Sequence, residues 1–148
     1  MQFTHHRILY VDNQVDSCEM MKVLLEMWGY QAELAHTAAD GLRLAQRTPF
    51  DLYLCETRLP EVSGFELCEQ ICRVPDHGPV VFISCEAYET DKQRGLQAGA
   101  SAYLTKPLDW GTLEATLTRL LPKAREKEQR TLLKASPVIT THAPLTMS

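Results

Sequence analysis

Short apolar runs that end in a polar residue recur along the first 105 residues. Three of them, 7–12, 50–56 and 79–84, are rich in Val, Ile, Leu and Tyr and are too short for helices, so they predict buried β-strands. Two shorter segments, 30–35 and 101–104, complete a predicted set of five strands.

The segments between these strands have helical character. In 14–28, apolar residues recur at three- and four-residue spacing before Gly29, which predicts an amphipathic helix. Thr37 and Asp40 resemble a capping box that opens a helix ending near Arg47. Further helices are predicted around 65–72, over 88–98, and from about 110 to 121. The 88–98 helix has only Leu96 and small residues to bury, so we expect it to be loosely held.

Strands that alternate strictly with helices form a parallel sheet covered on both faces. We therefore predict an α/β fold: a flavodoxin-like, doubly wound, five-stranded parallel sheet with strand order 2-1-3-4-5 and five helices.

The composition fits one domain followed by a tail. The chain has 148 residues, of which 45% are apolar and 23% charged. Residues 1–122 carry 10 basic and 17 acidic side chains, and residues 123–148 carry five and two. We predict a domain over 1–122 and a charged linker and disordered tail over 123–148. The tail is either the end of a complete protein, as Met1 favours, or a linker to a missing output domain.

Charge and cysteine content exclude several classes of function. A net charge of −4 provides no general attraction for nucleic acid, and no apolar run is long enough to span a membrane. Five cysteines without paired spacing indicate buried thiols in a reducing compartment. None of the five histidines is proposed as catalytic, and His5, His6 and His142 are expected in solvent. We expect a cytoplasmic protein without direct nucleic-acid or membrane partners.

Polar residues follow the carboxyl ends of four predicted strands. They are Asp12 and Asn13, Glu56, Ser84, and Lys106. In a doubly wound sheet these ends converge where the strand order reverses, so the sequence predicts one pocket there.

This set of residues resembles the receiver domain of two-component response regulators over about residues 7–121. The likeness rests on Ile8–Asp12, Asp51–Glu56 with Leu59, Pro60 and Gly64, Pro79–Ser84, and Ala98–Ala100 with Tyr103–Pro107. The resemblance implies an acidic pair and an aspartate that hold Mg²⁺. It also implies that this aspartate takes a phosphoryl group from a histidine kinase, and that a Ser or Thr and a Lys bind the phosphoryl oxygens.

Two positions depart from the family pattern. Glu56 replaces the phosphoacceptor aspartate and Asn13 replaces the second acid, whereas Ser84 and Lys106 match. With one carboxylate fewer, the pocket should bind Mg²⁺ weakly or not at all. We hypothesise that the longer arm of Glu56 reaches towards Ser84 and Lys106, pairs with Lys106 and imitates a phosphoryl group. The alternative is that Glu56 has no signalling role and only neutralises the charge of Lys106.

The resemblance also assigns neighbouring positions. Arg58 and Glu86 lie at the pocket mouth. They form an ion pair in one alternative, Arg58 turns inward to Glu56 or Asp12 in a second, and both side chains are solvated in a third. Tyr103 occupies the position of an aromatic switch residue. A homodimer through the fourth and fifth helices is one option, although Ser101 and Ala102 replace an acidic pair common in regulators that dimerise there.

Three functions compete. The first is a pseudo-receiver that binds a signalling partner, either a histidine kinase or an output domain, without phosphorylation. The second is a working phospho-accepting receiver. The third is a flavodoxin-like enzyme or nucleotide binder. The sequence does not favour it, because it has no Gly-rich phosphate loop after Asp12 and no apparent nucleophile–base pair. We expect no enzymatic activity and no cofactor other than weakly bound Mg²⁺.

Overall fold

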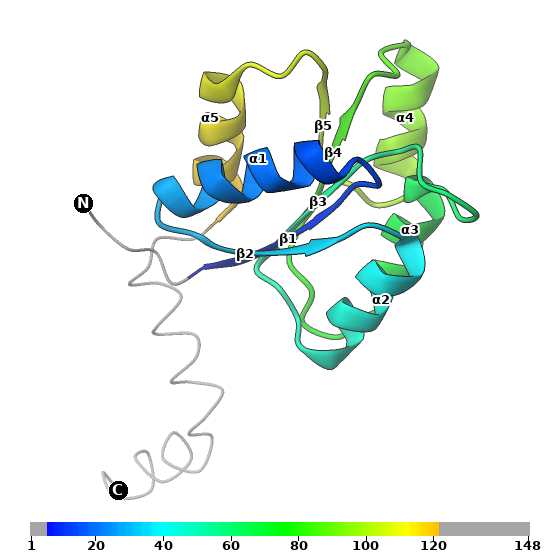
Figure 1. Cartoon of the computed structure of the whole chain (residues 1–148). Coiled ribbons are helices and arrows are strands. Elements are labelled where there is room, and N and C mark those ends of the chain that lie inside the picture. The colour runs from blue at the N-terminus through cyan, green and yellow to red at the C-terminus, as the bar shows by residue number, and fades with distance from the viewer. Residues whose placement is uncertain (1–5, 122–148) are drawn as a thin grey trace, which may run out of the picture.

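The computed structural model of the chain describes residues 6–121, and the predicted linker and tail lie outside this range. One parallel sheet forms the centre of the fold, with the strand order β2-β1-β3-β4-β5 that the sequence predicts (Figure 1). Its strands are β1 (Arg7–Val11), β2 (Gln31–Ala35), β3 (Leu52–Cys55), β4 (Val80–Ser84) and β5 (Ala102–Thr105).

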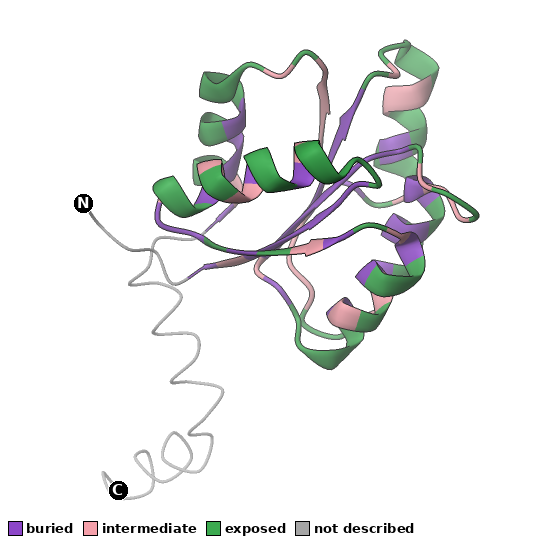
Figure 2. Cartoon of the chain, viewed as in Figure 1, coloured by how far each residue is buried: buried purple, intermediate pink, exposed green. Residues whose placement is uncertain are grey.

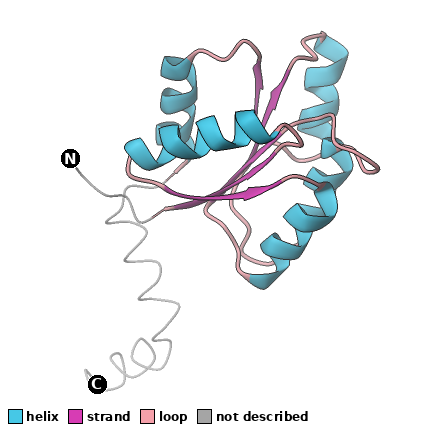
Figure 3. Ribbon diagram, viewed as in Figure 1, coloured by secondary structure: helices cyan, strands magenta, loops and turns pink. Residues whose placement is uncertain are grey.

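Four helices connect the strands and a fifth follows β5, and together they cover both faces of the sheet (Figures 1 and 3). They are α1 (Val15–Met27), α2 (Ala38–Arg47), α3 (Gly64–Ile71), α4 (Glu89–Gln97) and α5 (Trp110–Leu120). Helices α1 and α5 lie on one face, and α2, α3 and α4 lie on the other. The α/β fold predicted from the alternating pattern is confirmed.

The core consists of two apolar layers, one on each side of the sheet (Figure 2). The three central strands contribute to both layers because successive side chains of a strand point to opposite faces. Leu9 and Tyr53 face α2 and α3, whereas Ile8 and Leu54 face α1 and α5. This double burial explains why the central strands are almost wholly apolar in sequence.

The helix starts follow the local sequence in three cases. Thr37, Ser63 and Asp109 each precede a helix and accept a hydrogen bond from the backbone N–H three residues on. These caps satisfy N–H groups that have no partner within the helix. The predicted capping position of Thr37 is confirmed.

Two expectations about burial are wrong. Leu96 is exposed, and Gly95 is the buried residue of α4, packed where a larger side chain would meet Tyr103 and Phe82. His6 is buried near Tyr30, with ring centroids 6.3 Å apart, instead of lying in solvent. Both errors arise because the tertiary neighbours of a residue, rather than its type, decide its burial.

The thiols are more varied than predicted. Cys18, Cys55 and Cys68 are buried, Cys72 is half-buried and Cys85 is exposed. No helix within residues 6–121 has the length and apolar character needed to cross a membrane.

Gly64 fixes the loop that follows β3. Its N–H donates to the Thr57 carbonyl, and an added Cβ would overlap the Glu56 carbonyl oxygen. We predict that Gly64→Ala lowers the free energy of unfolding by about 1 to 3 kcal/mol, because backbone atoms must move to admit the methyl group. Urea denaturation measures the change.

Gly111→Ala is the matched control. Gly111 lies in the first turn of α5, where an added Cβ meets only the Asp109 side chain at an ordinary distance. It should leave stability unchanged or raise it by up to about 1 kcal/mol. Equal effects of the two substitutions would contradict the packing argument.

Candidate functional site

Asp12 lies directly after β1 and is fully buried. Its Oδ2 accepts a hydrogen bond from the Tyr10 hydroxyl at 2.7 Å and lies 3.4 Å from Lys106 Nζ, and its Oδ1 accepts one from the Gln14 N–H at 3.0 Å. Burial and the neighbouring Asp12 raise the pKa of Tyr10, so this tyrosine remains a neutral donor. Both carboxylate oxygens of Asp12 therefore have partners within the protein.

Two further side chains contact the backbone of Asp12. The Cys18 thiol donates to the Asp12 carbonyl oxygen at 3.1 Å, and His36 Nδ1 lies 3.2 Å from the same oxygen. Burial raises the pKa of Cys18 to about 11, so it is a neutral thiol at physiological pH. Spacing alone does not predict the contact of His36 with Asp12, because the two residues lie 24 positions apart.

The Glu56 carboxylate follows β3 and accepts from four donors. Its Oε2 lies 2.8 Å from Lys106 Nζ. Its Oε1 accepts from the Thr57 N–H at 2.8 Å, the Thr57 hydroxyl at 3.1 Å and the Arg58 N–H at 3.4 Å. The predicted pairing of Glu56 with Lys106 is present, and the carboxylate also holds the loop that carries it.

Lys106 follows β5 and connects both buried acids. Its side chain is 25% exposed and pairs with Asp12 and Glu56. Burial by itself lowers the pKa of Lys106. The hydrogen bonds to Glu56 and Asp12 and the attraction of their negative charges outweigh this effect, so the pKa of Lys106 is raised. The lysine is therefore a cation at physiological pH, between two carboxylates.

Ser84 is linked to Glu56 through Thr57. The Ser84 and Thr57 hydroxyl oxygens are 2.6 Å apart, and the Glu86 N–H donates to Ser84 Oγ at 3.0 Å. We expected the Glu56 arm to extend towards Ser84 itself, but Thr57 lies between them and is 2% exposed. The signal that sequence reasoning missed was a hydroxyl directly after Glu56 at the carboxyl end of a strand.

At the pocket mouth, Arg58 Nε donates to Glu86 Oε1. The predicted pairing is present, and the alternative in which Arg58 turns inward to Glu56 or Asp12 is wrong. The hydrogen bond to Glu86 raises the pKa of Arg58. Because the Arg58 side chain is 82% exposed, solvent screens this pair and it contributes little to stability.

Tyr103, on β5, packs beneath α4. Its ring centroid is 5.8 Å from that of Phe82, and an added Cβ on Gly95 would approach its ring to 2.9 Å. Its hydroxyl donates to the Glu86 carbonyl oxygen at 2.6 Å. Burial raises the pKa of Tyr103, so the hydroxyl keeps its proton. Tyr103 and Ser84 thus bond to the same residue, Glu86.

The predicted site residues therefore fall into one connected cluster with an exposed rim. Asp12, Glu56, Ser84 and Lys106 meet at the carboxyl edge of the sheet, and Tyr103 adjoins them through Glu86. Asn13 lies at the exposed rim.

Comparison with known proteins identifies the family. The model of the response regulator receiver domain matches residues 8–118. The chain belongs to this family. The transcriptional regulatory protein ZraR of Salmonella typhimurium is 34% identical over 119 residues, which cover 80% of this chain and 27% of ZraR. The chain thus spans about a quarter of the length of that curated relative.

Other relatives agree with the family and the fold. The transcriptional regulatory protein PcoR of Escherichia coli is 32% identical, with 82% of this chain and 54% of PcoR covered. A CheY-like receiver domain from Methanospirillum hungatei has a TM-score of 0.75 at 30% identity, with 85% of this chain and 98% of that chain covered. Receiver domains are signalling modules of two-component systems, so this chain carries such a module.

The receiver family implies a Mg²⁺ site, and the residues of this chain do not fit one well. Both oxygens of Asp12 and both of Glu56 are occupied by protein donors, and Lys106 lies between them. Asn13 offers a neutral amide, whereas protein sites bind Mg²⁺ mainly through one or two carboxylates and water in near-ideal octahedral geometry. Within residues 6–121, no three or more His, Cys, Asp or Glu side chains are grouped to bind a metal ion.

Removing the Lys106 charge should destabilise the domain. We predict that Lys106→Met lowers the free energy of unfolding at pH 7 by about 2 to 3 kcal/mol, because two buried carboxylates lose their shared cation. The loss is smaller than for a fully buried pair because Lys106 is partly exposed. Urea denaturation measures it, and Lys92→Met, at a half-buried lysine of α4 outside the pocket, is the control.

The sign of the pH dependence follows from the raised pKa of Lys106. Its contribution is complete below the unfolded-state pKa of about 10.4 and is lost as pH rises through the higher folded-state value. The stability difference between wild type and Lys106→Met should stay constant from pH 7 to about pH 10 and shrink at higher pH. A difference that shrinks on going from pH 7 to pH 9 would contradict this assignment.

Proposed function

We propose that this receiver is a pseudo-receiver, which binds a signalling protein without being phosphorylated. The observation that carries the proposal is the Glu56 carboxylate, which accepts from Lys106, from Thr57 and from the Arg58 N–H. In the family a phosphoryl group bonds to the equivalent lysine and hydroxyl residue. Glu56 engages Lys106 directly and is linked to the Ser84 hydroxyl through Thr57, which leaves few donors for an incoming phosphoryl group.

The surroundings of Glu56 support an arrangement similar to the activated one. Lys106 is paired, Ser84 is hydrogen-bonded to Thr57 on the Glu56 side, and Tyr103 is packed against Phe82. The resemblance to receivers associates an inward aromatic with a Ser or Thr drawn to the phosphoryl group. One carboxylate carries less charge than a phosphoryl group, so the imitation is partial.

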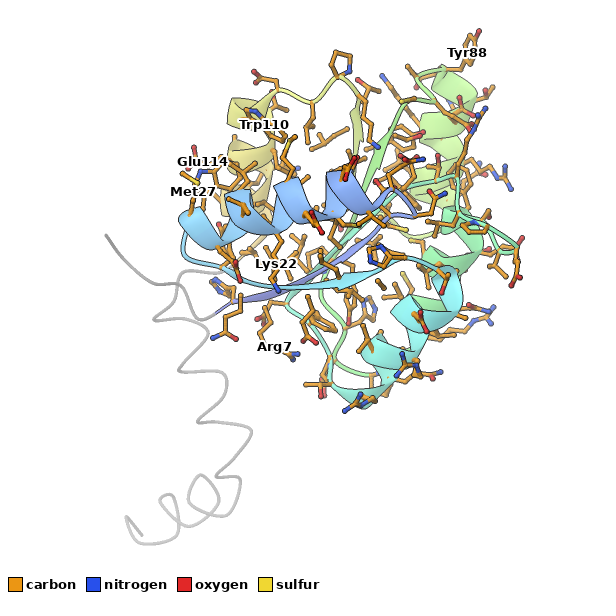
Figure 4. The ribbon with its side chains drawn as sticks, in the orientation of Figure 1. Arg7, Lys22, Met27, Tyr88, Trp110 and Glu114 are labelled. Carbon is orange, nitrogen blue, oxygen red and sulfur yellow. The ribbon has the colours of Figure 1, made fainter. Side chains whose placement is uncertain are left out.

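The partner is a protein in this proposal. Tyr88 at the start of α4 is 79% exposed and points away from the sheet in Figure 4, and Leu96 of the same helix is also exposed. Exposed apolar side chains on one helix are suited to contact with another protein. The partner classes are a histidine kinase, an output domain, and a second copy of this chain through α4 and α5. We expect no Mg²⁺ requirement and no enzymatic turnover.

The second candidate function is a working phospho-accepting receiver. Ser84 and Lys106 favour it, because both match the family residues that bind phosphoryl oxygens. In that case Glu56 itself would carry the phosphoryl group, with Lys106 next to it.

Phosphorylation by a small donor separates the two functions. We predict that wild type, incubated with acetyl phosphate and Mg²⁺, keeps its mass, because Glu56 is engaged and the acidic pair is incomplete. The double variant Glu56→Asp, Asn13→Asp should gain one phosphoryl group. Intact-mass spectrometry provides the readout.

Two further samples make each result interpretable. The double variant combined with Lys106→Ala should not be labelled, which shows that label on the double variant depends on the pocket. A wild-type protein labelled on Glu56 would overturn the pseudo-receiver proposal. A double variant that folds but is not labelled would contradict the assignment of the lost phosphorylation to Glu56 and Asn13 alone.

A further inference from the structure

One order of protons satisfies the contacts of the Thr57 and Ser84 hydroxyls with Glu56, with each other and with the Glu86 N–H. Glu56 Oε1 is a carboxylate oxygen and can only accept, so the Thr57 hydroxyl, 3.1 Å away, donates to it. The Thr57 proton is then used, and the 2.6 Å contact requires Ser84 to donate to Thr57. The Ser84 oxygen accepts from the Glu86 N–H. All three hydrogen bonds therefore point towards the charge of Glu56.

This series of hydrogen bonds ends at Glu86, whose backbone N–H and carbonyl groups are both hydrogen-bonded to side chains. The Glu86 N–H bonds to Ser84, and the Glu86 carbonyl oxygen accepts from the Tyr103 hydroxyl at 2.6 Å. Glu86 lies between β4 and α4, and Tyr103 lies beneath α4. Successive hydrogen bonds therefore connect the segment before α4 to Glu56.

We infer that Thr57 is a positioning residue that couples the charge of Glu56 to Ser84, Glu86 and Tyr103. A hydrogen bond to a charged acceptor is stronger than one between neutral groups, and successive bonds polarise one another. Thr57 holds Ser84 in a single orientation by accepting its proton while donating its own to Glu56. Without the Thr57 hydroxyl, Ser84 has no connection to the carboxylate by this route.

The route through Thr57 is separable from the ion pair. Lys106 engages Oε2 of Glu56, whereas the hydroxyl chain begins at Oε1. A substitution at Thr57 can therefore break the chain and leave the Glu56–Lys106 pair in place. Thr57→Val does this with little change of shape, because valine replaces the hydroxyl by a methyl group.

The inference rests on the proposed function in one respect: the state of the pocket is taken to affect α4, which the proposal uses to contact the partner. It is tested without a partner or a phosphodonor, so its failure is distinguishable from labelling of Glu56 by acetyl phosphate.

Hydrogen exchange of the Glu86 amide, followed by NMR on the full chain, is the first test. We expect Thr57→Val to speed exchange about fivefold to tenfold, the effect of losing one hydrogen bond. Thr57→Ser, which keeps a hydroxyl, should restore the wild-type rate. The Leu54 amide in central β3 reports global stability. The Glu86 exchange rates of the variants are compared under conditions in which the Leu54 amide exchanges at the same rate.

Thr116→Val is the matched control for removing a buried threonine hydroxyl. The Thr116 hydroxyl is also buried, and it donates to the Thr112 carbonyl oxygen at 2.8 Å within α5. This substitution should leave the Glu86 amide unchanged. A Glu86 exchange rate that is the same in Thr57→Val and wild type would overturn the inference.

A double-variant cycle tests the coupling itself. Glu56→Gln removes the charge and should shift the Tyr103 ring resonances in the wild-type background. In the Thr57→Val background the same substitution should shift them much less, because the connection is already broken. Equal shifts in both backgrounds would show that the charge acts on Tyr103 by another route, and the inference would be wrong.

Discussion

Two buried carboxylates that share one lysine are the constraint on which the site depends. Asp12 and Glu56 come from the ends of adjacent strands, and each would be costly to bury as an unpaired anion. Lys106 makes their proximity tolerable, and the raised pKa of its amine reflects the same interaction. The remaining oxygens are satisfied locally, by Tyr10 and Gln14 around Asp12 and by the loop after β3 around Glu56. The pocket is therefore filled by its own hydrogen bonds.

The parallel sheet makes this arrangement possible. Strands β1, β3, β4 and β5 end at the same edge, so residues more than 90 positions apart, such as Asp12 and Lys106, meet without long loops. The loop after β3 must also turn tightly to direct its N–H groups back onto the Glu56 carboxylate. Gly64 permits that turn because its lack of a side chain allows the two backbone segments to touch.

Much of the fold could be predicted from the sequence, because the alternation of apolar runs with amphipathic segments is a strong and local signal. The convergence of Asp12, Glu56, Ser84 and Lys106 followed from the rule that parallel strands share one carboxyl edge. The Glu56–Lys106 and Arg58–Glu86 pairs were also predicted, but the other hydrogen bonds of the site were not, because they depend on side-chain directions that spacing does not encode. Thr57 shows this clearly: its type and position were visible, but its place between Glu56 and Ser84 requires coordinates. The burial of Gly95 in place of Leu96 likewise depends on where Tyr103 packs.

The anion that fills this pocket is attached to the chain by carbon–carbon bonds. A phosphoryl group on an aspartate is an acyl phosphate, which is lost by hydrolysis. The phosphorylated state of an ordinary receiver therefore has a limited lifetime, which is set by the rate of this hydrolysis. A glutamate cannot be hydrolysed away, and no phosphatase can remove it. If Glu56 takes the place of a phosphoryl group as proposed, the duration of a signal is set by how long the protein persists and how much of it the cell makes. Control would then pass from the chemistry of the pocket to the synthesis and turnover of the chain.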